Sequence, residues 1–380
     1  MVRMVSTLVL GALLIGCGLI FPAQTEDADK EKVKWAEHRQ RAAQYYDGGD
    51  FIRAAAQYKK ALNIKPNHIM TQLGYAYSLK NTKHVPNVML SIKVFNDEIP
   101  QQSDLNREVK RIFGSADCYR MLAVQFRRRA DSRENKGLLK QAGEDRVFSA
   151  QYANDGIVGF ERVLAIDHEM EARQITSPFR ASASLAPLAH LGIGVCCIVL
   201  GDRKNQAPLD RALEEINVYA QTAANARTWW EKERKKKIET EPMADAQIPS
   251  AGEALGGVED RRRYDERIKS TIQKEALVRQ ALVQTYMYLE RYPDAIDQCT
   301  RVVELDDTAP DALYYRARAY ALLKPPQYER AVEDMKEYRS RQDLSRLTQK
   351  VIQINKLIRS YERKLHEQKK QAEADRTTNG

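Results

Sequence analysis

The chain has 380 residues, with 61 Lys and Arg against 52 Asp and Glu, and so a formal net charge of +9. Charged residues make up 30% of the chain and only 18 residues are Gly, which suits a helical protein with a large solvated surface. The positive charge favours an anionic surface as partner. Lipid headgroups, peptidoglycan or an acidic protein remain open, whereas nucleic acid is excluded if the chain is exported.

Residues 1–23 carry the features of an export signal. Arg3 is followed by an apolar run that ends in small residues, which is typical of such signals. The run closes on Leu14-Ile15-Gly16-Cys17, which resembles a bacterial lipobox. The resemblance implies a signal peptide over 1–17, lipid attachment at Cys17, and a lipoprotein facing the periplasm. Because Gly18 follows Cys17, it also favours the outer membrane in a diderm bacterium. The alternative is an uncleaved membrane helix over 7–23, which would be short for a bilayer.

Residues 18–34 are expected to form a tether, since 24–34 are polar and charged and cannot build a core. After this tether one pattern of small, aromatic and apolar residues occurs three times, with a period of about 34 residues. The three copies are Ala42, Tyr45, Phe51, Ala54, Tyr58 and Ala61; Val283, Tyr286, Tyr292, Ala295, Cys299 and Val302; and Ala317, Tyr320, Tyr328, Ala331, Met335 and Tyr338.

Each copy predicts two amphipathic helices joined by a short polar turn, because its apolar positions recur at three- and four-residue steps. Such a pair cannot bury its apolar face alone, so neighbouring pairs must stack. These residues resemble the tetratricopeptide repeat (TPR) family. The resemblance implies an all-α solenoid of about six stacked helix-turn-helix repeats with a C-terminal capping helix. It also implies a binding scaffold with no particular partner specified.

Under this interpretation residues 35–224 form an N-terminal array, clear over 35–68 and degenerate over 69–224. The second unit has Gly74 and Tyr77, then an enlarged loop over 81–87. The third carries a charged insertion at 128–146, and the fourth begins near Gly192. The apolar stretch 184–200 is interpreted as a central solenoid helix that its neighbours cover, rather than as a membrane span.

Residues 225–266 lack apolar periodicity and are predicted to be a charged linker, disordered in its middle. Trp229, Trp230 and the following lysines are either a helix extension with a solvated end or a contact with lipid headgroups. A C-terminal pair of TPR repeats is expected over 267–345. A capping helix over 346–372 and a disordered tail over 373–380 complete the chain.

No catalytic or metal-binding motif stands out, because the six His are scattered and no CxxC, GxSxG or phosphate-binding loop occurs. We therefore expect no enzyme, no cofactor and no metal. Cys196 and Cys197 are adjacent in one helix and cannot pair with each other, so free buried thiols are favoured. An exported setting would still permit a disulfide between Cys118 and one of the other cysteines, and the pairing is left open.

Two functional hypotheses follow, a scaffold that binds a protein or peptide in the repeat groove, and an accessory subunit of an envelope assembly machine. The second would dock through the convex face or the terminal helix. The TPR resemblance implies groove-facing residues on the first helix of each repeat: Arg39, Tyr46, Asp47, Tyr75, Gln280, Gln284, Met287, Tyr288, Tyr314, Arg318 and Leu322. It also implies small residues where helices cross closely: Ala42, Ala54, Ala61, Gly74, Gly192, Ala295, Ala317 and Ala331.

Overall fold

The structure is a computed structural model that describes residues 22–173, 181–201, 205–240, 251–306, 311–341 and 348–378. Within these ranges every regular element is a helix, so the predicted all-α fold is confirmed. The chain divides into two compact units, residues 1–185 and 186–380. Each unit is described by itself below. The predicted export signal and Cys17 lie outside the described residues.

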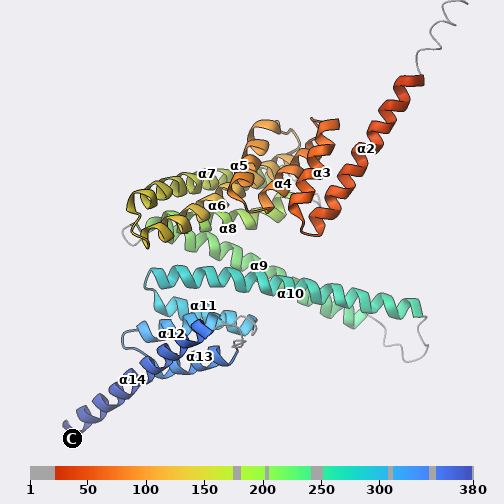
Figure 1. The fold of residues 1–380 in the computed structure, drawn as a ribbon. Coiled ribbons are helices and arrows are strands. Elements are labelled where there is room, and N and C mark those ends of the chain that lie inside the picture. The colour runs from red at the N-terminus through yellow and green to blue at the C-terminus, as the bar shows by residue number, and fades with distance from the viewer. Residues whose placement is uncertain are drawn as a thin grey trace, which may run out of the picture. The chain divides into compact units, whose positions relative to one another are not determined.

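The first unit consists of helices that pack against one another in chain order (Figure 1). They are α2 (Pro22–Asp47), α3 (Phe51–Ile64), α4 (Ile69–Asn81), α5 (Val85–Lys93), the π-helical segment η1 (Val94–Glu98), α6 (Leu105–Glu134) and α7 (Leu139–Ala172). A first core forms where Leu73, Val88, Phe95 and Leu122 come together from α4, α5, η1 and α6.

Small side chains set the spacing of the first pairs. Ala42, Ala54 and Ala61 are completely buried, which allows the helix backbones to approach one another. At Gly74 an added Cβ would lie 2.6 Å from the ring of Tyr58, so α3 and α4 can pack this closely only with glycine there. The turn before α3 is closed by Asp50, whose carboxylate accepts a hydrogen bond from the Arg53 backbone N–H at 3.1 Å.

In most of the second unit, too, helices that are neighbours in the chain pack against one another. It contains α8 (Ala181–Leu200), α9 (Ala207–Thr240), α10 (Ala251–Tyr288), α11 (Tyr292–Leu305), α12 (Asp311–Leu322), α13 (Tyr328–Ser340) and α14 (Thr348–Thr378). One core joins residues of α8, α9, α10 and α11, and another joins α12, α13 and α14. Over the described residues of both units the helices α2 to α13 form six consecutive pairs, with α14 in the position of the predicted capping helix.

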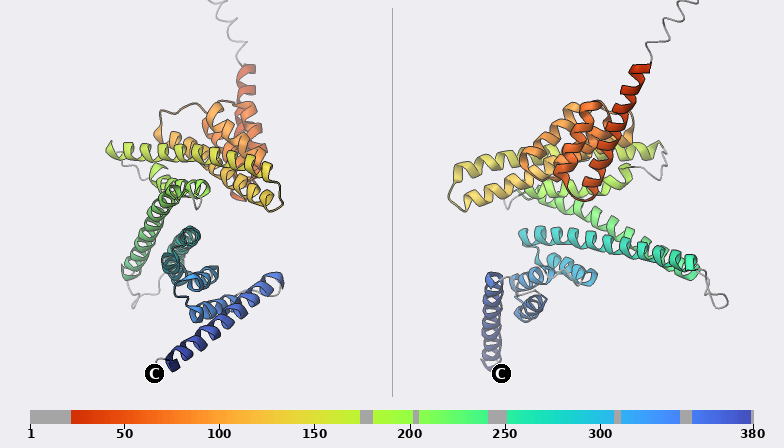
Figure 2. Two further views of the ribbon diagram at one scale, coloured as in Figure 1. Left: turned by 90° about the vertical axis from the view of Figure 1, so that its left-hand side faces the viewer. Right: turned by 45° about the vertical axis from the view of Figure 1, so that its right-hand side comes forward.

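Neighbouring helices form two long hairpins. α6 and α7, which form the third pair, run antiparallel beside each other, as do α9 and α10, which belong to the fourth and fifth pairs; both hairpins can be followed in Figures 1 and 2. The charged insertion predicted over 128–146 is therefore helical except at 135–138, where α6 turns into α7. The enlarged loop predicted over 81–87 is similarly shorter, since α4 ends at Asn81 and α5 begins at Val85.

The segment predicted as a charged linker over 225–266 also differs. α9 continues to Thr240 and α10 begins at Ala251, and only 241–250 lies outside the described residues. The charged residues of this segment are good helix formers, and Arg227 pairs with Glu231 one turn later at 3.2 Å. Across the hairpin Arg234 contacts Asp265 at 2.7 Å, so the charges that suggested a linker instead join two helices.

The two ends of the chain are more helical than predicted. The segment expected to be a tether over 18–34 is helical from Pro22. It forms the first half of α2, which runs on past Trp35 without a break. The tail expected to be disordered over 373–380 is helical up to Thr378. Neither segment contains a Gly or Pro inside its helix. Side-chain contacts one turn apart also support the helix at the C-terminal end, where the Gln371 amide donates a hydrogen bond to the Asp375 carboxylate at 3.1 Å.

Candidate functional site

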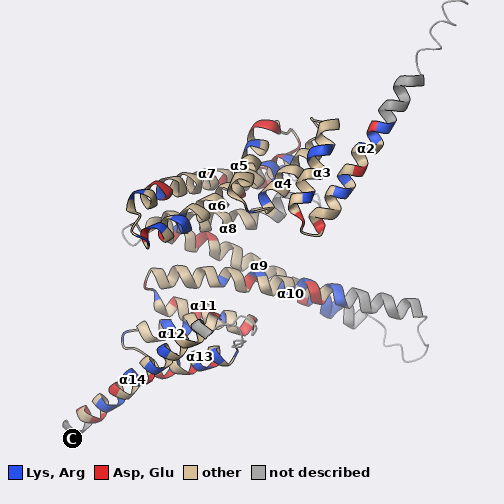
Figure 3. Ribbon diagram, in the orientation of Figure 1, with Lys and Arg blue, Asp and Glu red and all other residues tan. Residues whose placement is uncertain are grey.

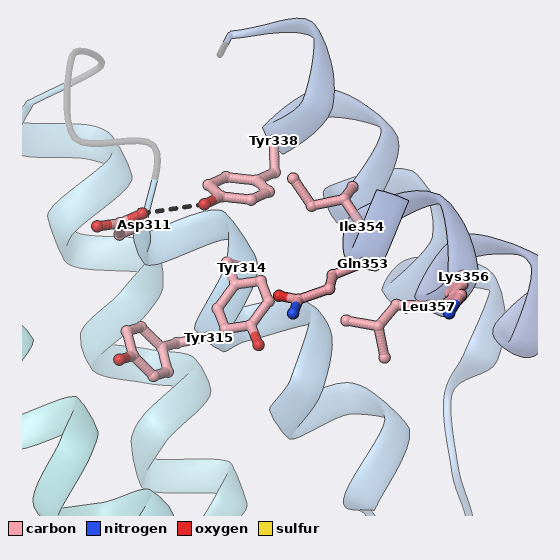
Figure 4. A pocket seen from close by; sticks show the side chains of 8 residues that line it. All are labelled: Asp311, Tyr314, Tyr315, Tyr338, Gln353, Ile354, Lys356 and Leu357. Carbon is pink, nitrogen blue, oxygen red and sulfur yellow. Dashed lines mark hydrogen bonds between the residues drawn. The ribbon is translucent and has the colours of Figure 1, made fainter. Parts of the chain in front are cut away.

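A cavity of about 550 Å³ lies among the last three helices of the second unit (Figure 4). α12 is the first helix of the sixth pair, and α14 packs against α13 where the first helix of a further pair would lie. The cavity is therefore formed between consecutive first-helix positions. Its lining residues are Asp311, Tyr314, Tyr315, Tyr338, Gln353, Ile354, Lys356 and Leu357.

The inner side of the cavity is fixed by buried side chains. Tyr338 is 1% exposed and Ile354 is 2% exposed, and both belong to the core of α12, α13 and α14. The Tyr338 hydroxyl donates a hydrogen bond to the Asp311 carboxylate at 3.2 Å, which ties α13 to the start of α12. The Tyr314 ring packs on Tyr338 with a centroid distance of 5.5 Å. Tyr314 is thus held in place before any ligand binds.

The outer side of the cavity combines aromatic rings with polar and cationic groups. Tyr315 meets Tyr314 edge to face at a centroid distance of 5.5 Å. The Arg318 guanidinium lies 5.7 Å from the centre of the Tyr314 ring. Gln353 and Lys356 of α14 are exposed at the rim. Such a surface offers large flat contact areas, an amide that can donate and accept hydrogen bonds, and positive charge.

A further tyrosine from α14 belongs to the core beside this cavity. Burial raises the pKa of Tyr361, while the charge of nearby Arg318 acts in the opposite direction. Because its net pKa is raised, the Tyr361 phenol stays protonated at neutral pH and brings no negative charge to this end of the unit. The charged groups at the cavity are therefore Arg318 and Lys356, together with the exposed Asp311 carboxylate at the start of α12.

The predicted groove residues of the second unit fall into two groups. Tyr314 lines the cavity and Arg318 lies beside it, and both come from α12. On α10, Gln284 and Tyr288 are exposed, while Gln280 and Met287 are half-buried. Leu322 is exposed at the end of α12.

The predicted groove residues of the first unit make contacts within the fold. Tyr46 accepts a hydrogen bond from the Asn81 amide at 2.8 Å, which joins α2 to the end of α4. Tyr75 packs against the core of α4, α5 and α6. Arg39 lies over the Trp35 ring at 4.8 Å, and Asp47 is exposed at the end of α2. Contacts within the repeats are therefore enough to explain the tyrosine side chains at positions 46 and 75, without a bound partner.

Sequence reasoning did not identify Tyr315, Gln353 or Lys356 as lining residues. It did find the apolar stripe of the capping helix that contains Ile354 and Leu357, but not the helix against which that stripe packs. The predicted close-crossing residues of this unit are buried: Ala295, Ala317 and Ala331 are 0% exposed, and Gly192 is also inside. Their small size leaves room for the neighbouring helices.

Other chemistry is sparse in the described part of the chain. No group of three or more His, Cys, Asp or Glu side chains there could hold a metal ion. No helix among the same residues has the length and apolar character needed to cross a bilayer. Cys118, Cys196, Cys197 and Cys299 are buried and not in disulfides. Burial raises the pKa of the Cys118 and Cys299 thiols to about 12, which makes both poor nucleophiles.

Comparison with known proteins yields structural matches only. No family model matches the sequence, and no curated protein matches it either. Among solved structures, the TPR2AB domain of yeast Sti1, described as a complex with pHSP90, is 12% identical with a TM-score of 0.23, covering 86% of this chain and 98% of that one. The TPR domain of P58(IPK) is 14% identical with a TM-score of 0.22, covering 88% and 99%. With TM-scores this low, these matches do not bear on function.

Proposed function

We propose that this protein is a binding scaffold that holds an extended segment of a partner protein in the cavity between α12 and α14. The observation that carries this proposal is the set of three tyrosines, one amide and one lysine around about 550 Å³ of open space. Aromatic faces, an amide and charged groups are the contacts that a bound peptide segment can use. We further propose that the scaffold is a bacterial lipoprotein, attached at Cys17 and facing the periplasm.

The lining residues indicate what kind of segment would fit. Tyr314 and Tyr315 present aromatic faces that suit an apolar or aromatic side chain, and tyrosine contributes strongly to interface energies. Gln353 can hydrogen-bond to an extended peptide backbone, since its amide both donates and accepts. Lys356 and Arg318 place positive charge at the rim, which favours a segment with a carboxylate next to its apolar side chain.

The test is a pull-down from detergent-solubilised envelopes, read by mass spectrometry. Tyr315→Ala combined with Lys356→Glu changes the rim but leaves Tyr338 and Ile354 in place, so the fold should survive, which circular dichroism checks. A matched control is Tyr264→Ala with Lys269→Glu on α10, because Tyr264 is half-buried against another aromatic ring and Lys269 is exposed. The rim variant should lose its partner and the control should keep it.

An unchanged partner set in the rim variant would overturn the cavity proposal. Binding would then belong to the convex face or to α14, as expected of an accessory subunit in an envelope assembly machine. The lipid anchor is tested separately. A Cys17→Ser chain should lose its acyl mass shift and remain uncleaved, whereas a native chain without any acyl group would favour the uncleaved membrane helix.

A further inference from the structure

The turn between α6 and α7 is short and well defined. Gly137 has φ of +76° and its N–H donates to the Glu134 carbonyl at 2.9 Å, while the Leu138 N–H donates to the Arg133 carbonyl at 2.9 Å. This pair of hydrogen bonds is the Schellman motif that ends a helix at a glycine. α7 starts at the next residue, Leu139. The hairpin therefore ends in a tight tip with a fixed backbone.

Two leucines occupy this tip without a structural reason for being apolar. Leu138 is 44% exposed and Leu139 is 68% exposed. Leu138 is also the N-cap of α7, where no side chain satisfies the first backbone N–H groups, although Ser, Asn or Asp would do so. In a Schellman motif an apolar residue at this place often packs back on the helix, but the residue it would meet is Arg133. Stability of the hairpin would thus favour a polar residue.

The charged residues nearest the leucines are two exposed lysines, Lys136 and Lys140. Neither forms an ion pair in the described structure. The arginines close by are engaged instead, because Arg129 and Arg133 both contact Asp145 and Arg146 contacts Glu134. Figure 3 shows Lys and Arg on both helices at this end of the hairpin. Residues 127–146 include seven Lys or Arg and four Asp or Glu, a net charge of +3.

We propose that the tip of the α6–α7 hairpin docks on a membrane surface that contains anionic lipid. Leu138 and Leu139 insert at the boundary between headgroups and acyl chains, and Lys136 and Lys140 contact the headgroup phosphates. Lysine suits this depth because its aliphatic stem can lie against apolar groups while the charge stays in water. This inference goes beyond the partner-binding cavity and does not depend on it.

The shape of the tip favours a lipid surface over a protein. A stable protein interface buries about 800 Å² on each partner, which two leucines at the apex of a hairpin cannot supply. A membrane interface accepts single apolar side chains, and nearby basic residues add attraction to anionic lipid. Two exposed leucines between two unpaired lysines have the composition that this kind of contact needs.

The experiment places a fluorophore near the tip of the full chain. The chain is reconstituted through its own N-terminal segment into vesicles of phosphatidylcholine, with or without phosphatidylglycerol. A Gln141→Cys variant carries the label at the tip, and Gln151→Cys carries it about 15 Å further along the same helix. Both glutamines are exposed. Quenching by spin-labelled lipid reports contact with the bilayer, with the unsubstituted chain as background.

We expect quenching at position 141, weaker quenching at 151, and a strong dependence on phosphatidylglycerol. Lys136→Gln with Lys140→Gln should lower the ratio of docked to undocked tip by about 30-fold. Leu138→Ser with Leu139→Ser should remove the quenching, whereas Leu277→Ser should not, since Leu277 is 67% exposed elsewhere. Circular dichroism checks that each variant is folded.

Three results would overturn the proposal. These are no quenching at 141 in vesicles with phosphatidylglycerol, equal quenching at 141 and 151, and equal quenching in the leucine variant and the unchanged tip. The first result would assign the tip to a protein partner or to no partner, because these vesicles contain only lipid besides the chain itself.

Discussion

The two long hairpins differ at their turn ends: α6–α7 has a buried carboxylate close to its turn, whereas the carboxylates in the described outer part of α9–α10 are exposed. Near the repeat core both hairpins have a buried carboxylate, Glu108 in α6 and Glu275 in α10. α6–α7 has helices of 30 and 34 residues, and α9–α10 has helices of 34 and 38. In the first, Asp145 lies close to the turn, within the first seven residues of α7, and its side chain is 2% exposed. In the second, Glu275 lies near the repeat core, and its side chain is also 2% exposed.

The partners of these carboxylates show what each one joins. Asp145 accepts hydrogen bonds from Arg129 and contacts Arg133, both on the opposite helix of the same hairpin. Glu275 contacts Arg227 of α9 at 3.2 Å and Arg279 of α10 at 2.8 Å. Arg279 in turn donates to Gln298 of α11 at 2.8 Å. Asp145 therefore closes the tip of its hairpin, whereas Glu275 fastens its hairpin to the following helix.

The outer halves differ accordingly. Beside Asp145, Phe126 and Phe148 pack with a centroid distance of 5.6 Å. In α9–α10 the contacts away from the repeat core include Arg234 with Asp265, whose side chains are 43% and 56% exposed. Exposed ion pairs of this kind contribute little. The turn end of α6–α7 is thus fastened by an ion pair with a buried carboxylate, whereas the outer part of α9–α10 relies on this exposed pair and on the Trp230–Tyr264 ring contact.

The largest expected effect comes from Glu275→Ala. The substitution leaves the Arg279 side chain, which is only 10% exposed, with the neutral Gln298 amide as its remaining partner. Removing one member of a buried ion pair costs about 3–5 kcal/mol of folding stability. Chemical denaturation followed by circular dichroism measures the loss. Asp265→Ala is the control on the same helix and should cost about 0–1 kcal/mol. Equal losses in the two variants would contradict the comparison of buried and exposed ends.

A smaller effect, with a defined pH dependence, is expected for Asp145→Asn. Hydrogen bonds from Arg129 and the charges of Arg129 and Arg133 lower the pKa of Asp145 below its ordinary value. Its contribution to stability is therefore complete above the unfolded pKa of about 3.9 and is lost as the pH falls through the lower folded value. At neutral pH the variant should lose about 1.5–3 kcal/mol, the usual contribution of a hydrogen bond to a charged group.

Melting curves between neutral and acidic pH test this prediction. The unchanged chain should lose stability below the ordinary Asp pKa, and the gap between it and Asp145→Asn should narrow there. Some acid sensitivity should remain in the variant: burial opposes ionisation of Asp117, but Arg120 and Lys80 outweigh it and lower its pKa. Glu144→Gln, at the exposed neighbouring residue, serves as the control. A gap that stays constant with pH would show that Asp145 does not act as a charged partner.

The repeat pairs could be predicted from sequence because their signals are local. Ala42, Ala54 and Ala331 occur at fixed sequence spacings from aromatic residues, and small side chains at these spacings predict where two helices pack closely. The hairpins could not be predicted in the same way. A charged run such as 231–237 has no apolar stripe that would predict a helix. Its place in a hairpin is seen only in the structure, where Trp230 packs on Tyr264 and Arg234 contacts Asp265 of α10.

Only part of the candidate site could be predicted from the sequence, for a related reason. Tyr314 and Arg318 lie at repeat positions, so their place near the groove follows from the register. Gln353 and Lys356 lie on α14, whose apolar stripe could pack against any neighbouring helix with a complementary face. Their contribution depends on the packing of α14 against α13 and on its approach to α12, which is tertiary information. Sequence periodicity gives the buried side of a helix but not its neighbour.

The smallest expected effect tests whether the α6–α7 hairpin is held firmly at its tip. Leu138→Ser supplies a side-chain acceptor at the N-cap of α7, where the native chain has none, and should raise stability by about 0.5–1 kcal/mol. Leu139→Ser, at the first helical position, removes a similar exposed leucine without creating a cap and should change stability very little. Thermal and chemical denaturation of both variants measure the difference. If α7 were frayed near Asp145, a cap would not raise global stability and both variants would match the native chain. A loss of stability in Leu138→Ser would instead show that Leu138 packs against the fold, and the tip would then have a structural reason for its leucines.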